Sequence, residues 1–132
     1  MSHTAKINTK FSDINLDSFR RALVNLGWKV VANAKARTYP SDPARDTVYP
    51  WVAVNPLPHG YDVGITISDS TREIEVNYDT FGGTVEQGLG AGLSRLKTEY
   101  NCCVIEDVMA FQGYTATREL QENGSVLVRC LG

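Results

Sequence analysis

The sequence predicts one α+β domain over residues 1–132, with two helices packed on one face of a mostly antiparallel sheet, in a ferredoxin-like or related arrangement. Two amphipathic helical patterns are separated by runs of short strand patterns. Near the C-terminus, Asn123-Gly124 lies between two strand patterns and is the strongest short signal for a β-hairpin. The length of 132 residues suits a single domain, and a hydrophobic content of 42% is typical of a folded chain.

The N-terminal part predicts a strand, a helix and a second strand. Residues 4–11 alternate loosely between apolar and polar side chains, which favours a strand. Four apolar residues then recur at steps of three and four: Leu16, Phe19, Leu23 and Leu26. This spacing predicts a helix that begins near Asn15 and ends at Gly27, followed by a strand over residues 28–37.

The segment of residues 38–60 contains all five prolines and is predicted to be mostly loop, because proline cannot donate to a strand ladder. Within it, residues 48–55 favour one short strand at an edge of the sheet. Four aromatic residues in or beside this segment are candidate partner-binding residues: Tyr39, Tyr49, Trp51 and Tyr61. Rigid aromatic loops are common binding hot spots, and the alternative is that these rings pack over the edge of the sheet.

The middle of the chain predicts two paired strands and a second helix. Residues 61–68 and 72–78 alternate well and are separated by a turn signal. Thr84 and Gln87 have the spacing of a capping box, which predicts a helix from Thr84 to about Asn101.

Three glycines, Gly88, Gly90 and Gly92, lie inside this helical pattern. No strand runs directly into them and no Gly-Lys-Ser or Gly-Lys-Thr follows, which argues against a phosphate-binding loop. We expect instead that a strand or helix, of this chain or of another copy, approaches the backbone closely. Residues 102–110 are apolar enough to predict a buried strand, which precedes the hairpin strands of residues 114–122 and 125–131.

In the predicted hairpin, a two-residue turn at Asn123-Gly124 places Arg118 opposite Arg129. Two like charges directly opposite each other are destabilising. Three explanations stay open: carboxylates compensate the pair, solvent surrounds it, or it binds an anion. Arg118 and Arg129 are therefore candidate anion-binding residues, unless a one-residue bulge at the turn changes the register.

Charge and hydropathy exclude several classes of partner. The net charge of −2 argues against general nucleic-acid binding. Residues 1–45 carry eight Lys or Arg against three Asp or Glu, and residues 46–132 carry five against twelve. This asymmetry favours either cancelling fields or separate basic and acidic faces. Without a membrane-length apolar run or the apolar core of a signal peptide, we expect a cytoplasmic protein with no membrane partner.

The sequence shows no metal-binding or catalytic motif. Cys102 and Cys103 are adjacent and Cys130 is remote, which is a poor disulfide framework. The histidines are His3 and His59, so neither a zinc site nor a Cys-His nucleophile is indicated. We therefore predict no metal, no cofactor and no catalytic residues.

Several short motifs together resemble a known family: Met1-Ser2-His3, Ile7-x-Thr9, Leu26-Gly27-Trp28, Gly60-Tyr61-Asp62-Val63-Gly64, Arg72-Glu73-Ile74-Glu75-Val76, Tyr100 and the stretch from Glu122 to Arg129. They are similar to a small conserved family of hypothetical chloroplast reading frames, number thirty-five in its series, also found in cyanobacteria and some bacteria. The family is classed as a domain of unknown function, and residues 38–58 and the glycine-rich helix depart from its pattern. The resemblance implies the chloroplast stroma or the cytosol of a cyanobacterial or phage-infected cell, with partners that include AAA-type ATPases.

Taken together, these observations favour a non-catalytic interaction or adaptor module. It would bind a protein partner, or a second copy of itself, through the aromatic loop and an exposed edge of the sheet. The first alternative is a small-molecule or anion-binding protein that uses Arg118 and Arg129. The second is a small enzyme of unknown type.

Overall fold

The computed structural model describes residues 4–12, 15–123 and 125–131, and for residues 4–12, 130 and 131 it describes the backbone alone. The Met1-Ser2-His3 motif and the turn glycine Gly124 lie outside the described residues. The strands are β1 (Thr4–Ser12), β2 (Lys29–Lys35), β3 (Val48–Val54), β4 (Val63–Ile67), β5 (Glu73–Asp79), β6 (Thr115–Leu120) and β7 (Val126–Leu131). The helices are α1 (Leu16–Asn25), α2 (Thr84–Leu89) and α3 (Ser94–Phe111).

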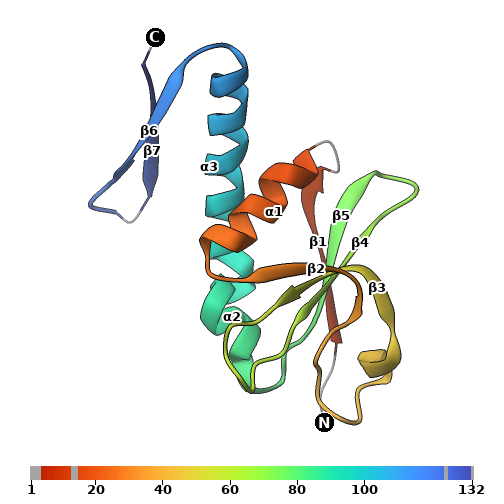
Figure 1. The fold of residues 1–132 in the computed structure, drawn as a ribbon. Coiled ribbons are helices and arrows are strands. Elements are labelled where there is room, and N and C mark those ends of the chain that lie inside the picture. The colour runs from red at the N-terminus through yellow and green to blue at the C-terminus, as the bar shows by residue number, and fades with distance from the viewer. Residues whose placement is uncertain (1–3, 13–14, 124, 132) are drawn as a thin grey trace.

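Five of the described strands form one large sheet in the order β1-β5-β4-β3-β2, with every neighbouring pair antiparallel. β1 and β2 lie at opposite edges of this sheet although only α1 separates them in the chain. α1 therefore crosses the face of the sheet, and Figure 1 shows all three helices on that side. The prediction of an α+β domain with helices on one face of an antiparallel sheet is confirmed.

The main core lies between the helices and the large sheet. Alternation along β4 and β5 turns Val63, Ile65 and Val76 toward the helices, as the strand pattern predicts. They meet buried side chains of the helices: Phe19, Ala22 and Leu23 of α1, Val85 and Leu89 of α2, and Leu96, Tyr100 and Cys103 of α3. A smaller cluster of Ala36, Tyr49 and Val52 covers part of β2 and β3 on the other face.

The predicted edge position of β3 is wrong, because β3 lies between β4 and β2. Pro50 is tolerated there because β3 pairs with β4 only from Trp51 to Ala53. On its other side, Pro50 lies opposite Asn33 of β2, whose φ of 50° interrupts the regular strand. The edge strand on this side of the large sheet is β2, next to β3.

The predicted helix over residues 84–101 is two helices. α2 ends at Leu89 because Gly90 has a φ of 87°, and α3 then runs from Ser94 to Phe111. Thr84 is the first helical residue rather than the cap, and its hydroxyl accepts a hydrogen bond from the Tyr61 N–H at 3.0 Å. The predicted capping box is therefore wrong.

Among the described residues, the expected approach of a strand or helix is not found at Gly88 or Gly92: the near neighbour of Gly88 is a side chain, and an added Cβ at Gly92 would have no atom within 4 Å. A Cβ added to Gly88 would lie 3.0 Å from the ring of Trp28, which is 2% exposed. The close neighbour is thus a side chain of this chain. The predicted strand over residues 102–110 is wrong, because these residues continue α3.

The strands that follow α3 do not return to the large sheet. β6 and β7 pair with each other antiparallel and contact α3, and Figure 1 shows the hairpin turning back after α3 and lying alongside that helix. The predicted hairpin is confirmed. A ferredoxin-like arrangement is not shown, because the hairpin forms a sheet of its own.

A polar network fixes the proline-rich segment after β3. The carboxylate of Asp62, 3% exposed, accepts hydrogen bonds from the backbone N–H groups of Arg37 and Asn55 and from the Arg37 guanidinium. The Asn55 amide donates to the carbonyls of Tyr61 and Thr84, both at 3.1 Å. This segment is therefore held against the start of α2 by hydrogen bonds rather than by a strand ladder.

Candidate functional site

The outer edge of β2 is open. No described strand pairs with this edge, so alternate backbone N–H and C=O groups of β2 face away from the large sheet. The regular part of the strand runs from Lys29 to Ala32, because the positive φ of Asn33 interrupts it. An added strand can therefore pair with about four residues of β2.

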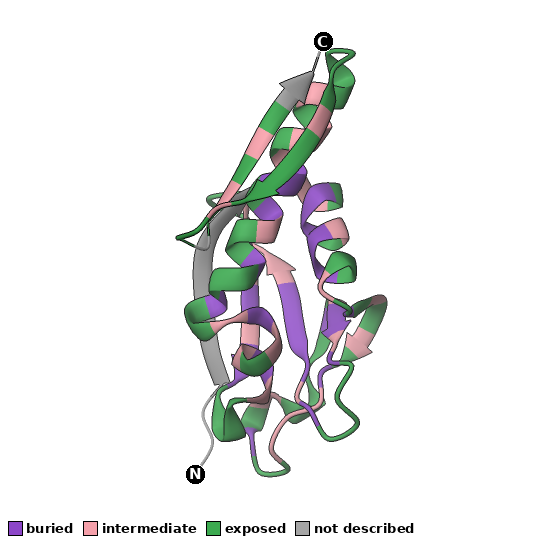
Figure 2. Ribbon diagram, turned by 90° about the vertical axis from the view of Figure 1, so that its left-hand side faces the viewer, coloured by how far each residue is buried: buried purple, intermediate pink, exposed green. Residues whose placement is uncertain are grey.

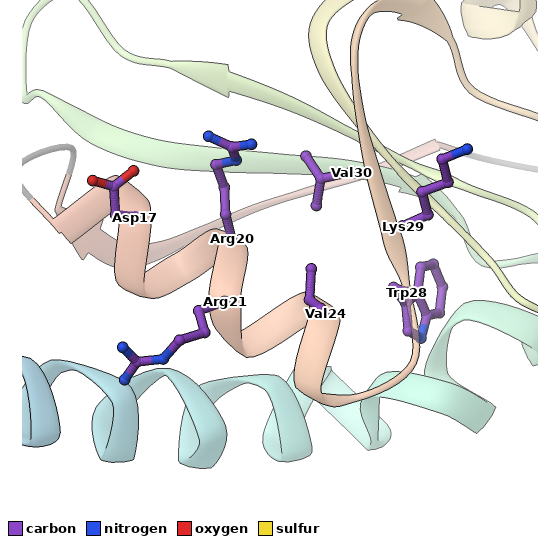
Figure 3. A pocket seen from close by; sticks show the side chains of 7 residues that line it. All are labelled: Asp17, Arg20, Arg21, Val24, Trp28, Lys29 and Val30. Carbon is purple, nitrogen blue, oxygen red and sulfur yellow. The ribbon is translucent and has the colours of Figure 1, made fainter.

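A groove runs beside this edge, between α1 and β2. Its volume is about 550 Å³. The wall from α1 consists of Asp17, Arg20, Arg21 and Val24, and the wall from β2 and the residue before it consists of Trp28, Lys29 and Val30. Figure 3 shows Val24 and Val30 facing each other across the groove. Helical spacing places the α1 residues on one face, next to the open edge.

The groove carries two cations that have no described partner. Arg20 and Lys29 are exposed and form no ion pair with any residue of the described part of the chain. Arg21 differs, because its guanidinium binds Asp107 and lies 3.4 Å from Glu106 of α3. Asp17 is the one carboxylate among the lining residues. The free charge of the groove therefore favours an anionic occupant over a cationic one.

Trp28 lines the end of the groove, but its indole N–H is not available to an occupant. The indole N–H is buried without a hydrogen-bond partner among the described residues. It lies beside Gly88 of α2, where an added Cβ would be 3.1 Å from the nitrogen. The groove thus presents an apolar floor with charges at its rim, a pattern suited to alternating side chains of an extended segment.

The four aromatic candidates for partner binding do not form one exposed patch. Tyr49 is 7% exposed and lies against Gly64 on the face opposite the helices. Trp51 and Tyr61 are partly buried against the main core. Tyr39 makes an edge-to-face contact with Phe81, with ring centroids 4.8 Å apart. Their surroundings match the packing alternative, and partner binding by these rings stays a prediction.

The predicted opposition of Arg118 and Arg129 is wrong. In the hairpin Arg118 lies opposite Val128, and Arg129 lies opposite Thr117, a shift of one residue from the predicted register. Because side chains alternate along a strand, the shift places the two arginines on opposite faces of the hairpin. The argument for an anion site between them no longer holds.

Carboxylates compensate each arginine separately. Arg118 binds Glu106 at 2.6 Å and Glu99 at 2.7 Å, both on α3, and Arg129 binds Glu119 at 2.9 Å. The hydrogen bond from Arg118 lowers the pKa of Glu106 below its ordinary value. Partial burial raises the pKa of Glu99, but hydrogen bonds from Asn25 and Arg118 outweigh burial and lower it overall. The Arg118 contacts connect the hairpin to α3, whereas the Arg129 pair lies within the hairpin.

Cys102 and Cys103, which were expected in a strand, lie on α3. Cys102 and Cys103 are buried with free thiols, and burial raises the pKa of both. Such thiols are poor nucleophiles at neutral pH. His59 is exposed on the proline-rich segment and makes no described hydrogen bond with either cysteine. Cys130 has no described side chain.

Two further findings concern the described part of the chain. Its His, Cys, Asp and Glu side chains do not gather in groups of three or more as they would around a metal ion. None of its helices combines the length and the apolar character needed to cross a membrane.

Comparison with known proteins gives no assignment. No family model, curated protein or solved structure matches the chain. The resemblance to the chloroplast family, with the location and partners that it implies, therefore stays a prediction.

Sequence reasoning did not single out the groove. Two sequence features could have indicated it. Arg20 and Val24 lie outside the apolar stripe that contains Phe19 and Leu23, and the strand that follows the helix begins close by, at Lys29. What the sequence does not show is that β2 is the edge strand, because that depends on β3 and β4 pairing inside the sheet.

Proposed function

We propose that this chain is a non-catalytic interaction module that captures an extended, acidic segment of a partner protein. The segment pairs with β2 as an additional strand and lies in the groove beside α1. The observation that carries this proposal is the open edge of β2 next to an apolar groove with two unpaired cations. Addition of a strand to a free sheet edge is a recurring mode of peptide recognition, in which pockets beside the edge select alternate side chains.

The groove defines the chemistry of the segment. Backbone groups of residues 29–32 supply main-chain hydrogen bonds, which give affinity without sequence selectivity. Val24 and Val30 favour apolar side chains at the positions that point inward. Arg20 and Lys29 favour Asp or Glu at neighbouring positions. Nothing in this arrangement requires a chemical step.

The proposal is tested by selecting random peptides of strand length that bind the whole chain. We expect enrichment of sequences that alternate apolar and acidic residues. The double variant Arg20→Glu, Lys29→Glu should lower the affinity for an enriched peptide by at least about tenfold, which corresponds to about 1.4 kcal/mol. Lys97→Glu is the matched control, because Lys97 is an exposed lysine of α3 outside the groove and should leave the affinity unchanged.

A second variant changes the apolar wall of the groove. Val24 is 58% exposed, so Val24→Asp leaves the core intact and places an anion where an acidic peptide must lie. We expect it to weaken binding of the enriched peptides without changing the melting temperature. Recovery of the same peptides by the charge-reversed double variant, or enrichment of basic peptides by the native chain, would contradict the proposal.

A further inference from the structure

The hairpin of β6 and β7 contributes little to either core. Among the described side chains, both buried clusters consist of residues before the hairpin. In Figure 2, the described residues of the hairpin are coloured exposed or intermediate, whereas the strands of the large sheet carry many buried residues. A two-stranded hairpin alone is marginally stable in water, so it depends on what covers it. In this chain its described contacts within the fold are mainly with α3.

Many of the exposed apolar side chains belong to α3 and the hairpin. Of ten large hydrophobic side chains that are exposed in the described part of the chain, six belong to the distal half of α3 and the hairpin: Ile105, Val108, Phe111, Tyr114, Leu120 and Leu127. Phe111 is 93% exposed and Leu120 is 79% exposed. Of these six, Ile105 and Leu127 line one groove between α3 and the hairpin, and apolar surface gathered in this way marks an interaction site.

The outer edge of β7 is open as well. The Gln121 N–H donates to the Ser125 carbonyl at 2.8 Å, which fixes the alternation of hydrogen bonds in the hairpin. By that alternation, the backbone groups of Val126 and Val128 point away from β6. Beside this edge lies a second groove of about 430 Å³, with Cys102 and Ile105 of α3 on one side and residues 125–128 on the other.

The chemistry of this groove differs from that of the groove beside β2. The arginines of the hairpin are paired, Arg118 with Glu99 and Glu106, and Arg129 with Glu119. Residues 114–131 contain two arginines and two glutamates, so the hairpin has no net charge. The occupant must therefore be a strand that is neutral and apolar at the positions facing α3.

β7 itself has these properties. Its residues from Val126 to Val128 are apolar, and Val126 and Val128 are the side chains on the α3 side of the hairpin. The β7 strand of a second copy can lie antiparallel to the first, so that the free backbone groups of the two strands pair with each other. Its Val126 and Val128 side chains then face α3 of the first copy. The contact is self-complementary, as a twofold interface requires. Because both copies use the same surface, the assembly stops at two chains.

We propose that the β7 edge and the distal half of α3 form a twofold interface between two copies of this chain. The two hairpins join through β7 into a four-stranded antiparallel sheet. Val126 and Val128 of each copy fill the groove beside Ile105 of the other. Ile105 and Val108, exposed in the single chain, are covered in the pair.

Two valines allow a matched test in the full-length chain. Val108 on α3 is 47% exposed and Val24 on α1 is 58% exposed, so the same change to aspartate leaves the core intact in both. Sedimentation velocity over a dilution series should show a dimer for the native chain and for Val24→Asp. Val108→Asp should sediment as a monomer with an unchanged circular dichroism spectrum.

A third variant tests the strand pairing itself. Val128→Pro removes a backbone N–H that points away from β6, so the hairpin ladder keeps its own hydrogen bonds while the free edge loses a donor. We expect at least about a tenfold weaker dimer. A native chain that remains monomeric at high concentration overturns the proposed interface, and so does a Val108→Asp variant that dimerises like the native chain. Either result leaves peptide capture at β2 untouched, because Val24→Asp reports on that groove separately.

Discussion

Gly64 determines where one of the predicted binding residues lies. It is on β4, and the ring of Tyr49 from β3 lies over it on the face away from the helices. A Cβ added to Gly64 would lie 2.5 Å from three ring atoms of Tyr49. The absence of a side chain at position 64 is what allows Tyr49 to be buried rather than presented to a partner.

We therefore predict that Gly64→Ala destabilises the fold by about 2 kcal/mol, the usual cost of overpacking a well-filled site. The free energy of unfolding from urea titration measures this. The double variant Gly64→Ala, Tyr49→Leu should recover part of the loss, because the smaller side chain leaves room for the new methyl group. Equal losses in the single and double variants would mean that Tyr49 does not occupy the space above residue 64.

At the scale of elements, α3 shows what local sequence patterns can and cannot predict. Strands β1, β2, β4 and β5, helix α1 and the C-terminal hairpin follow from alternation, helical spacing and turn residues. The composition of residues 102–110 predicts a buried strand, because most of these residues are apolar. In α3, Cys103 faces the core while Ile105 and Val108 are exposed, so the helix lacks the polar outer face on which an amphipathic pattern depends.

Other features depend on contacts between distant residues. Asp62 binds Arg37 from 25 positions away, and Arg21 binds Asp107 from 86 positions away. The position of β2 at the edge of the sheet depends on the order of all the strands. The hairpin register differs from the predicted one by a single residue, which is enough to separate Arg118 from Arg129. The aromatic candidates could be named from the sequence, but their burial could not.

The attachment of the hairpin to α3 gives an element-scale prediction. Arg118 connects β6 to Glu99 and Glu106, and its side chain is 30% exposed. Arg118→Gln leaves Glu99 without its cation and Glu106 with only Arg21 at 3.4 Å, and should lower stability by about 1–2 kcal/mol, between the values for exposed and buried ion pairs. Arg129→Gln is the control, because the Arg129–Glu119 pair is exposed and its loss should be close to neutral. An anion site would give the opposite sign, with Arg118→Gln more stable than the native chain.

Because of these ion pairs, the stability difference between the native chain and Arg118→Gln should depend on pH. The pKa of Glu106 is lowered from an ordinary value of 4.5, chiefly by its hydrogen bond with Arg118. A carboxylate with a lowered pKa in the folded state stabilises the fold above its ordinary pKa, and this contribution is lost as the pH falls through the lowered value. Native chain and Arg118→Gln should therefore differ fully above pH 4.5 and converge below it in thermal unfolding. A constant difference across this range would show that the ion pairs are not its cause.

For the whole molecule, the two proposed surfaces should respond to salt in opposite directions. Peptide capture at β2 depends on Arg20 and Lys29, whose exposed charges are screened at high ionic strength. The hairpin interface is apolar and has no net charge, so salts that are excluded from protein surfaces should strengthen it.

The last prediction concerns how much of the molecule the hairpin stabilises. Every described member of the main core lies at or before Val104, so a chain that ends at Gly113 keeps the large sheet, α1, α2 and all of α3. It loses the Arg118 ion pairs and the other contacts between the hairpin and α3. We expect this shortened chain to fold cooperatively, with a melting temperature lower by about 5–10 °C, which corresponds to about 2 kcal/mol at this size. It should also be monomeric while still binding the peptides selected at β2. Loss of the near-ultraviolet circular dichroism signal on truncation would show instead that the hairpin is an integral part of the fold.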